Sequence, residues 1–182
     1  MIRGYVPEYV RPYRESRDYS ELRNLMFSLP LILQARIIVE TGLSRGLSTQ
    51  IFLEAVELLN NSGIASMLFT IDIEDSPETR KRLHDLKLDN YWQFIMDDSI
   101  KASEKWISLY SPIDLLYLDS DHSKAHVTRE LQVWGQLVRK GGIILVDDCL
   151  EGTGTLEAVK ESEFHSVTFF DAEGMCLLWK RW

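Results

Sequence analysis

Cysteine, basic charge and long apolar runs are all scarce in this chain. Only Cys149 and Cys176 are present, which rules out a disulfide framework and is typical of a reducing compartment. The 20 Lys and Arg residues are outnumbered by 28 Asp and Glu, and the net charge of -8 argues against a non-specific nucleic-acid binder. Polar residues and Pro30 interrupt the longest apolar stretch, and the first residues lack an apolar signal core. We therefore expect a cytoplasmic protein with no membrane span and no nucleic-acid partner.

The length and composition suit one globular domain. The chain has 182 residues, of which 45% are hydrophobic and 26% are charged, so it can bury one sizeable core. We expect residues 1–35 to form an N-terminal extension and a helix, and residues 36–182 to form the core of the domain. The opening residues 1–20 are rich in Tyr, Arg and Pro and are expected to lie across the surface.

Strand-like apolar runs alternate with helical patterns along the rest of the chain. The expected strands are 36–40, 66–73, 91–96, 113–119, 142–148, 166–170 and 175–180. Four of the expected helices are 21–33, 47–59, 100–109 and 155–163. Another begins at Ser76 as its N-cap. The remaining one carries an apolar stripe of Val127, Leu131, Trp134 and Val138 and ends at Gly141-Gly142. Residues 171–174 are expected to form a hairpin turn. This order predicts a Rossmann-like three-layer α/β/α sandwich with a mostly parallel seven-stranded sheet and one antiparallel strand from the C-terminal hairpin.

Two of the apolar strands end in acids. One run ends at Asp119 and is followed by His122, and another ends at Asp147 and Asp148. A buried carboxylate costs several kcal/mol unless it is paired, hydrogen-bonded or bound to a metal. The carboxyl ends of parallel strands meet on the edge where such folds bind ligands. These residues therefore predict a site for a cation, for a proton transfer, or for both.

A glycine-containing loop follows the first strand of the core. It reads Glu40-Thr41-Gly42-Leu43-Ser44-Arg45-Gly46-Leu47-Ser48. Gly42 allows a tight turn, and the free amides at the start of the next helix can receive an acceptor group. A phosphate-binding P-loop is excluded because no Gly-Lys-Ser/Thr follows, and the dinucleotide fingerprint fits poorly. The acid at the strand end would repel a pyrophosphate but suits a ligand that carries a cationic amine.

Motifs on successive strand ends carry a family resemblance. They are Glu-x-Gly-x-x-x-Gly-x-Ser from Glu40, the strand ending in Asp72, the Asp98-Ser99 pair, and the strands that end in Asp119 and in Asp147-Asp148. This pattern resembles the class I S-adenosylmethionine-dependent methyltransferases. It is most similar to the metal-assisted small-molecule O-methyltransferases of the catechol and macrolide-sugar types, from about residue 36 to the end of the chain.

The resemblance implies a role for each matching residue. The residues implied to bind S-adenosylmethionine are Glu40, Thr41, Gly42, Ser44, Gly46, Ser48, Asp72, Asp98, Ser99 and Asp119. Asp72 would accept the ribose hydroxyls, while Asp98 and Ser99 would flank the adenine edge or cap a helix. Asp119, Asp147 and Asp148 would hold Mg²⁺. His122, together with Asp119, would serve the catalytic step.

The resemblance also implies the chemistry. A bound Mg²⁺ would lower the pKa of the acceptor hydroxyl, and His122 would take its proton near neutral pH. His122 stands where the catechol type has Lys, and Asp148 where that type has Asn. The expected partner is a small-molecule acceptor, and a homodimer is left open.

Other interpretations use the same residues. His122 and His126 are spaced as a zinc pair would be, but no third soft ligand is evident. Together with Asp119 they could also supply the two His and one carboxylate of an iron enzyme of the cephalosporin-hydroxylase-like kind. A third alternative is a cofactor-binding domain with a degenerate catalytic site.

Overall fold

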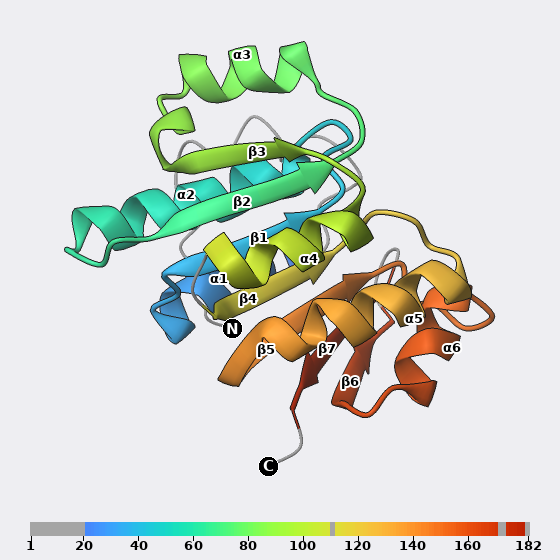
Figure 1. Cartoon of the computed structure of the whole chain (residues 1–182). Helices are drawn as coiled ribbons and strands as arrows, with labels where there is room; N and C mark the ends of the chain where they lie inside the picture. Colours follow the sequence, from blue (N-terminus) through green and yellow to red (C-terminus); the bar gives the residue numbers. More distant parts are fainter. Residues whose placement is uncertain (1–20, 110–111, 171–173, 181–182) are drawn as a thin grey trace.

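One seven-stranded sheet organises the molecule. The computed structural model describes residues 21–109, 112–170 and 174–180. The strands lie in the order β3-β2-β1-β4-β5-β7-β6 (Figure 1). Their bounds are β1 Ile37–Thr41, β2 Met67–Asp72, β3 Trp92–Met96, β4 Ile113–Leu118, β5 Val138–Asp147, β6 His165–Phe169 and β7 Met175–Trp179. Strand β7 alone runs antiparallel, between β5 and β6, as the sequence predicts.

Helices cover both faces of the sheet (Figure 1). Their bounds are α1 Glu21–Leu33, α2 Leu47–Asn61, α3 Pro77–Asp85, α4 Ser99–Leu109, α5 Lys124–Val133 and α6 Gly154–Glu161. One apolar core packs α4, α5 and α6 against the sheet, and a second packs α1, α2 and α3 against the other face. The three-layer α/β/α sandwich is therefore confirmed.

The largest buried side chains explain why the helices dock where they do. Trp106 of α4 meets Phe69 of β2 edge to face at 5.0 Å and Trp134 at 5.6 Å between ring centroids. On the opposite face, Phe52 of α2 meets Tyr117 of β4 at 5.4 Å. Burying such rings removes about 150–250 Å² of surface each, which makes them the main anchors of the two helical layers.

Two expected element boundaries are wrong. The stripe that includes Val138 predicts one helix as far as Gly141, but α5 ends at Val133 and β5 begins at Val138. A short 3₁₀ helix, Gly135–Leu137, separates α5 from β5, and a Cβ atom on Gly135 would lie 2.5 Å from the Phe164 ring. Gly141 and Gly142 lie inside β5 instead of ending a helix, and the register between β4 and β5 shifts in this stretch.

Other local signals hold. Ser76 caps α3, since its hydroxyl accepts a hydrogen bond from the Thr79 amide at 3.3 Å, and Pro77 opens the helix. The predicted surface placement of residues 1–20 and most of the predicted turn at residues 171–174 lie outside the described residues.

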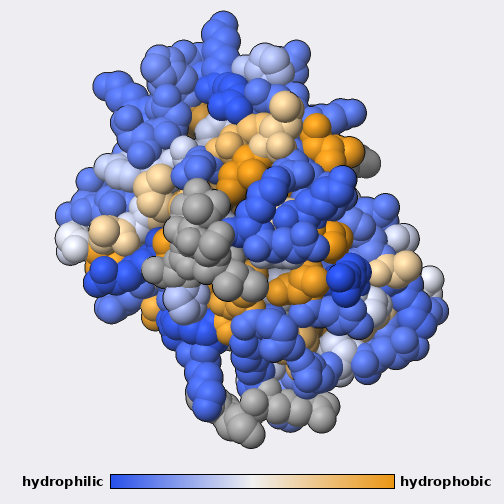
Figure 2. Space-filling view, viewed as in Figure 1, coloured by the Kyte–Doolittle hydropathy of each residue, from blue (hydrophilic) through white to orange (hydrophobic). Residues whose placement is uncertain are grey.

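The outer surface is largely hydrophilic on the face shown in Figure 2, with smaller apolar areas between the polar ones. Among the residues that the structure describes, no helix has the length and apolar character needed to cross a membrane.

Candidate active site

The predicted loop lies at the carboxyl end of β1, where three alternate residues have positive φ. The values are 91° at Gly42, 42° at Ser44 and 62° at Gly46. A Cβ atom on Gly42 would run into the carbonyl oxygen of Asp119, so the loop touches the end of β4 directly. Ser44 is exposed at the tip and holds a conformation that costs a non-glycine residue about 1–2 kcal/mol. The loop is therefore a shaped turn against β4.

Helix α3 holds this loop from behind. The guanidinium Nη2 of Arg82 donates to the carbonyl oxygens of Arg45 at 2.6 Å and Gly46 at 2.9 Å. A Cβ atom on Gly46 would collide with the Thr79 methyl group, so Gly46 is needed for this close packing. The start of α2 that follows has no side-chain cap, which leaves its amides able to meet an acceptor.

Glu40 lies beneath the loop and is completely buried. Its carboxylate accepts three hydroxyl hydrogen bonds: Ser48 Oγ at 2.5 Å, Thr49 Oγ1 at 2.7 Å and Thr70 Oγ1 at 2.8 Å. Burial raises the pKa of Glu40 to about 7 despite these donors. Glu40 thus joins β1, α2 and β2 and supports the loop, and Ser48 is one of its partners.

Thr41 and Asp72 complete the inner half of the site. Thr41 is fully buried, and its carbonyl oxygen accepts a hydrogen bond from the Asp119 amide at 3.0 Å. Asp72 Oδ2 accepts the Leu43 amide at 2.6 Å, and Oδ1 accepts the Glu74 amide at 3.0 Å. Its carboxylate therefore ties the end of β2 to the glycine loop and keeps further acceptor capacity for ribose hydroxyls.

Asp98 and Ser99 start α4. Asp98 Oδ1 accepts the Lys101 amide at 3.0 Å, which is the helix-capping role that the sequence leaves open beside adenine binding. The Ser99 hydroxyl is buried and lies 3.2 Å from His126 Nε2. Ile73 and Met96, at the adjacent ends of β2 and β3, are 69% and 70% exposed and offer apolar surface beside these residues.

Asp119 lies among other acids in the middle of the site. Burial raises the pKa of Asp119 to about 9, and the charges of Asp147 and Glu40 add to this effect. The buried Tyr117 hydroxyl hydrogen-bonds to Asp147 and also contacts Asp119. Burial and the neighbouring acids therefore favour the protonated form of Asp119.

His122 pairs with Asp148 on the outer half of the site. Its Nδ1 atom lies 2.7 Å from Asp148 Oδ2, and its Nε2 atom lies 3.9 Å from Asp119 Oδ1. Asp148 adopts φ 53°, a strained value for a residue with a side chain. The His122 side chain is 43% exposed, so the ring is partly accessible to solvent.

The predicted metal ligands do not form a ligand set here. Across residues 21–109, 112–170 and 174–180, no group of three or more His, Cys, Asp or Glu side chains is arranged to hold a metal ion. Asp148 turns to His122, and Asp147 hydrogen-bonds to Tyr117. The expectation that Asp119, Asp147 and Asp148 converge as Mg²⁺ ligands is therefore not supported by this geometry.

The zinc and iron interpretations fail for the same reason. His126 Nε2 faces Ser99, Ser120 and Glu130, whereas His122 faces Asp148. The described residues therefore do not bring the two histidines and Asp119 into one metal site.

Several residues of the site are missed by the sequence reasoning. They are Tyr117, Arg82, Ser120, His126 as a partner of Ser99, and Glu130. Tyr117 carries a usable signal, because it is the one aromatic residue in β4, the strand that the acid Asp119 follows directly. Arg82 carries none, since its contacts depend on how α3 folds back onto the loop.

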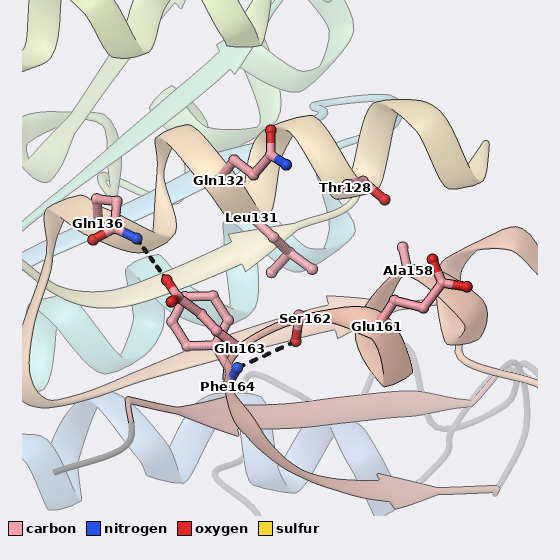
Figure 3. A pocket seen from close by; sticks show the side chains of 9 residues that line it. All are labelled: Thr128, Leu131, Gln132, Gln136, Ala158, Glu161, Ser162, Glu163 and Phe164. Carbon is pink, nitrogen blue, oxygen red and sulfur yellow. Dashed lines mark hydrogen bonds between the residues drawn. The ribbon is translucent and has the colours of Figure 1, made fainter.

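Two cavities lie away from these residues. One of about 320 Å³ lies between α5 and α6 beside Phe164 and is drawn in Figure 3. Another of about 480 Å³ lies at the starts of β1, β2 and β4, where Arg36 and Arg139 line it. None of the predicted cofactor-binding, catalytic or metal residues lines either cavity.

Comparison with known families decides the assignment. A family model described as a methyltransferase domain matches residues 39–149. This range includes the glycine loop, Asp72, Asp119, Asp147 and Asp148. The chain belongs to this methyltransferase family. No curated protein matches the sequence of this methyltransferase.

Solved methyltransferases share the fold. The O-methyltransferase TomG from Streptomyces achromogenes, in complex with SAM, has TM-score 0.74 and 17% identity, covering 99% of this chain and 93% of its own. The O-methyltransferase from Bacillus cereus, in complex with SAH, has TM-score 0.71 and 14% identity, covering 95% and 86%. A protein described as an rRNA methylase, from Clostridium thermocellum, has TM-score 0.66 and 20% identity, covering 91% and 100%. At these identities the likeness concerns the fold of the methyltransferase and leaves its acceptor open.

Proposed function

We propose that this methyltransferase transfers a methyl group from S-adenosylmethionine to a hydroxyl group of a small molecule. The observation that carries the proposal is the His122–Asp148 pair, with 2.7 Å between Nδ1 and Oδ2, on the same edge of the sheet as the glycine loop. A hydroxyl acceptor needs a base to become nucleophilic, and a histidine held by a carboxylate is a suitable one.

The inner half of the site fits S-adenosylmethionine. The loop at Gly42 and the uncapped start of α2 present backbone amides, and Asp72 keeps acceptor capacity for a ribose. Ile73 and Met96 supply exposed apolar surface for the adenine faces. The acids around Asp119 create a negative potential that suits a sulfonium and an ammonium group. When bound, the cofactor supplies a methyl group already activated on sulfur.

His122 and Asp148 would act on the acceptor. Asp148 accepts the hydrogen on Nδ1, which leaves the Nε2 lone pair free to take the acceptor's hydroxyl proton. The acceptor oxygen then forms its bond to the methyl carbon as the bond from carbon to sulfur breaks. In-line alignment of oxygen, carbon and sulfur supplies much of the rate through proximity.

Small molecules are favoured over RNA as acceptors by charge. The formal net charge is -8, which opposes binding to a polyanion, although one neighbour of similar fold is described as an rRNA methylase. TomG and the Bacillus cereus protein are both described as O-methyltransferases.

The first test compares His122→Ala with His84→Ala. His84 is an exposed histidine on α3 that also pairs with an aspartate, Asp89, so it is a matched control. We expect His122→Ala to lower turnover on a hydroxyl acceptor by about 10²–10⁴-fold, the usual contribution of general-base catalysis, with SAH affinity unchanged. Turnover is measured as SAH formation, and affinity by calorimetry. Equal turnover in the two variants would remove His122 as the base.

A metal requirement is tested separately. Because the described residues present no three-ligand set, we expect turnover to survive EDTA. Loss of turnover that Mg²⁺ restores would show that the acids rearrange around a cation when the acceptor binds.

A further inference from the structure

The cavity of about 480 Å³ at the starts of β1, β2 and β4 lies at the end of the sheet opposite the candidate active site. The three strands are parallel, and their arrows point away from this end toward the edge that carries the glycine loop (Figure 1). Its volume falls in the usual range of small-molecule sites, about 300–1,000 Å³. An occupant of this cavity would therefore be distinct from the cofactor and from the methyl acceptor.

Asp114 lines this cavity, and its negative charge is already balanced. Its Oδ2 atom accepts the backbone amides of Arg36 at 2.7 Å and Ile37 at 2.9 Å. Its Oδ1 atom accepts a hydrogen bond from Arg139 Nε, an ion pair that joins β4 to β5. Asp114 is 8% exposed, and a carboxylate so buried needs partners that offset its lost hydration. The pair of Asp114 and Arg139 thus adds no net charge to the cavity.

Arg36 gives the cavity one positive charge that nothing balances. The residue is exposed and lines the cavity. Across residues 21–109, 112–170 and 174–180, its guanidinium has no ion pair and no hydrogen bond. This local charge is opposite in sign to the net charge of -8 on the chain. A guanidinium presents two parallel N–H groups that match the two oxygens of a carboxylate, so Arg36 is a suitable anchor for an acidic ligand.

Most of the remaining lining is apolar. Ile37 and Met67 both line the cavity and are partners in the register of β1 and β2. The Met67 amide donates to the Arg36 carbonyl oxygen at 2.9 Å, so the apolar surface begins directly beside Arg36. Ala65 is exposed and adds a small side chain at the same place. This surface suits the hydrocarbon or aromatic body of a ligand.

Ser66 lines the same cavity with a hydroxyl that lacks a partner. It is 2% exposed, and its Oγ atom has no hydrogen-bond partner among the residues that the structure describes. Its backbone is held by Asn60, whose amide group contacts both the Ser66 carbonyl oxygen at 2.9 Å and the Ser66 amide at 3.3 Å. Buried hydroxyl groups are usually hydrogen-bonded, so Ser66 is a donor next to Arg36 that is still without an acceptor.

The charges favour a monoanion over a phosphate dianion. The cavity offers one unbalanced cation, Arg36, while the Asp114 carboxylate on its wall would repel a second negative charge on the ligand. A carboxylate carries a single charge and two acceptor oxygens, which matches one guanidinium and one hydroxyl donor.

We propose that this cavity is a second small-molecule site, which binds a monocarboxylate with an apolar body. Arg36 binds the carboxylate, Ile37 and Met67 contact the apolar body, and the Asp114–Arg139 pair holds the start of β1 in place. The inference does not depend on the proposed function, because the cavity shares no residue with the candidate active site.

The test is a calorimetric titration of the full chain with 2-naphthoate, a flat aromatic monocarboxylate. We expect saturable binding to one site with Kd of about 1 mM or below, and the same Kd with and without saturating SAH. Arg36→Gln should weaken binding by about tenfold or more, the usual effect of losing a hydrogen bond to a charged group. Ala65→Phe should weaken it as well, because the added ring occupies the cavity without changing the charge.

Two related ligands separate the charge from the apolar body. Naphthalene-2-carboxamide has the shape of 2-naphthoate without its charge, so it should bind wild-type protein more weakly and with the same Kd in Arg36→Gln. Millimolar inorganic phosphate should not displace 2-naphthoate. Displacement would show a general anion site and would overturn the inference.

The matched control is Arg129→Gln, which removes the same charge from an exposed position on α5 and should keep the wild-type Kd. The inference is wrong if 2-naphthoate does not bind wild-type protein at millimolar concentration, or if Arg36→Gln and Arg129→Gln weaken binding equally. Displacement of 2-naphthoate by SAH would place the probe at the cofactor edge and would also contradict the second site. A failure of SAH to bind contradicts the proposed function alone, since the titration without SAH still decides this inference.

Discussion

At the level of single residues, the site contains a close contact that leaves no space for a larger side chain. Gly42 has φ 91° and lies against the Asp119 carbonyl, so its missing side chain serves both the turn and the contact with β4. Gly63 has nearly the same backbone angle, φ 88°, but nothing lies within 4 Å of its added Cβ atom. Substituting Gly63 therefore introduces backbone strain alone, whereas substituting Gly42 introduces the same strain together with a steric collision.

We expect Gly42→Ala to cost far more than Gly63→Ala. The Gly63 change should lower the free energy of unfolding by about 1–2 kcal/mol, the cost of a left-handed conformation alone. The Gly42 change adds a collision with backbone and should also abolish SAH binding. Urea unfolding and calorimetry measure the two effects. Equal losses of unfolding free energy in both variants would show that Gly42 is not in close steric contact with the end of β4.

The sequence predicts most of these residues because acids at strand ends stand out from apolar runs. Glu40, Asp72 and Asp119 all lie at the expected edge of the sheet. The sequence does not reveal which of these side chains contact one another. Asp148 forms its contact with His122 from a residue with φ 53°, a turn that no local sequence signal marks. Cofactor contacts of the individual residues stay predictions.

At the scale of elements, Glu40 joins three of them through one carboxylate. The hydroxyls that it accepts come from the start of α2 and from β2, while Glu40 itself is on β1. Burial raises the pKa of Glu40 to about 7 from an ordinary value of 4.5. Between pH 4.5 and about 7, the folded protein therefore keeps a proton on Glu40 that the unfolded chain has released.

The pH dependence of stability follows from this shift. A raised carboxyl pKa stabilises the fold fully below pH 4.5, and the contribution is lost as pH rises through about 7. The loss from Glu40 is about 3 kcal/mol for a shift of this size. Glu40→Gln does not titrate there, so its free energy of unfolding should fall less between pH 4.5 and 7.5 than that of wild-type protein.

The measurement is urea unfolding at both pH values, with the exposed Glu104→Gln as the control that keeps the wild-type pH dependence. Parallel curves for Glu40→Gln and wild-type protein would show that Glu40 is ionised throughout.

The C-terminal end of α5 differs from the one that the sequence predicts. The apolar spacing from Val127 to Trp134 continues in phase to Val138, so periodicity alone extends α5 too far. The Phe164 ring, distant in sequence, lies where a Gly135 side chain would be, and the chain continues there as a 3₁₀ helix, Gly135–Leu137, before β5. Such a tertiary contact is not visible in the local pattern.

At the scale of the whole molecule, the order of strands brings the functional residues together. Strands β1 and β4 are neighbours in the sheet, although they are far apart in the chain, so Gly42 reaches Asp119. Strand β5 lies beside β4 and places Asp148 next to His122. The alternation of strands and helices predicts this shared edge, because right-handed crossovers put all parallel strand ends on one side.

Titration of the wild-type protein with SAH in a calorimeter shows directly whether this edge of the sheet binds S-adenosylmethionine. We predict saturable binding to one site per chain with Kd in the micromolar range or below, about −8 kcal/mol at 1 μM. Gly42→Ala should abolish the signal, and Gly63→Ala should retain it. An absence of binding by folded wild-type protein at high micromolar SAH would show that this edge is not a cofactor site.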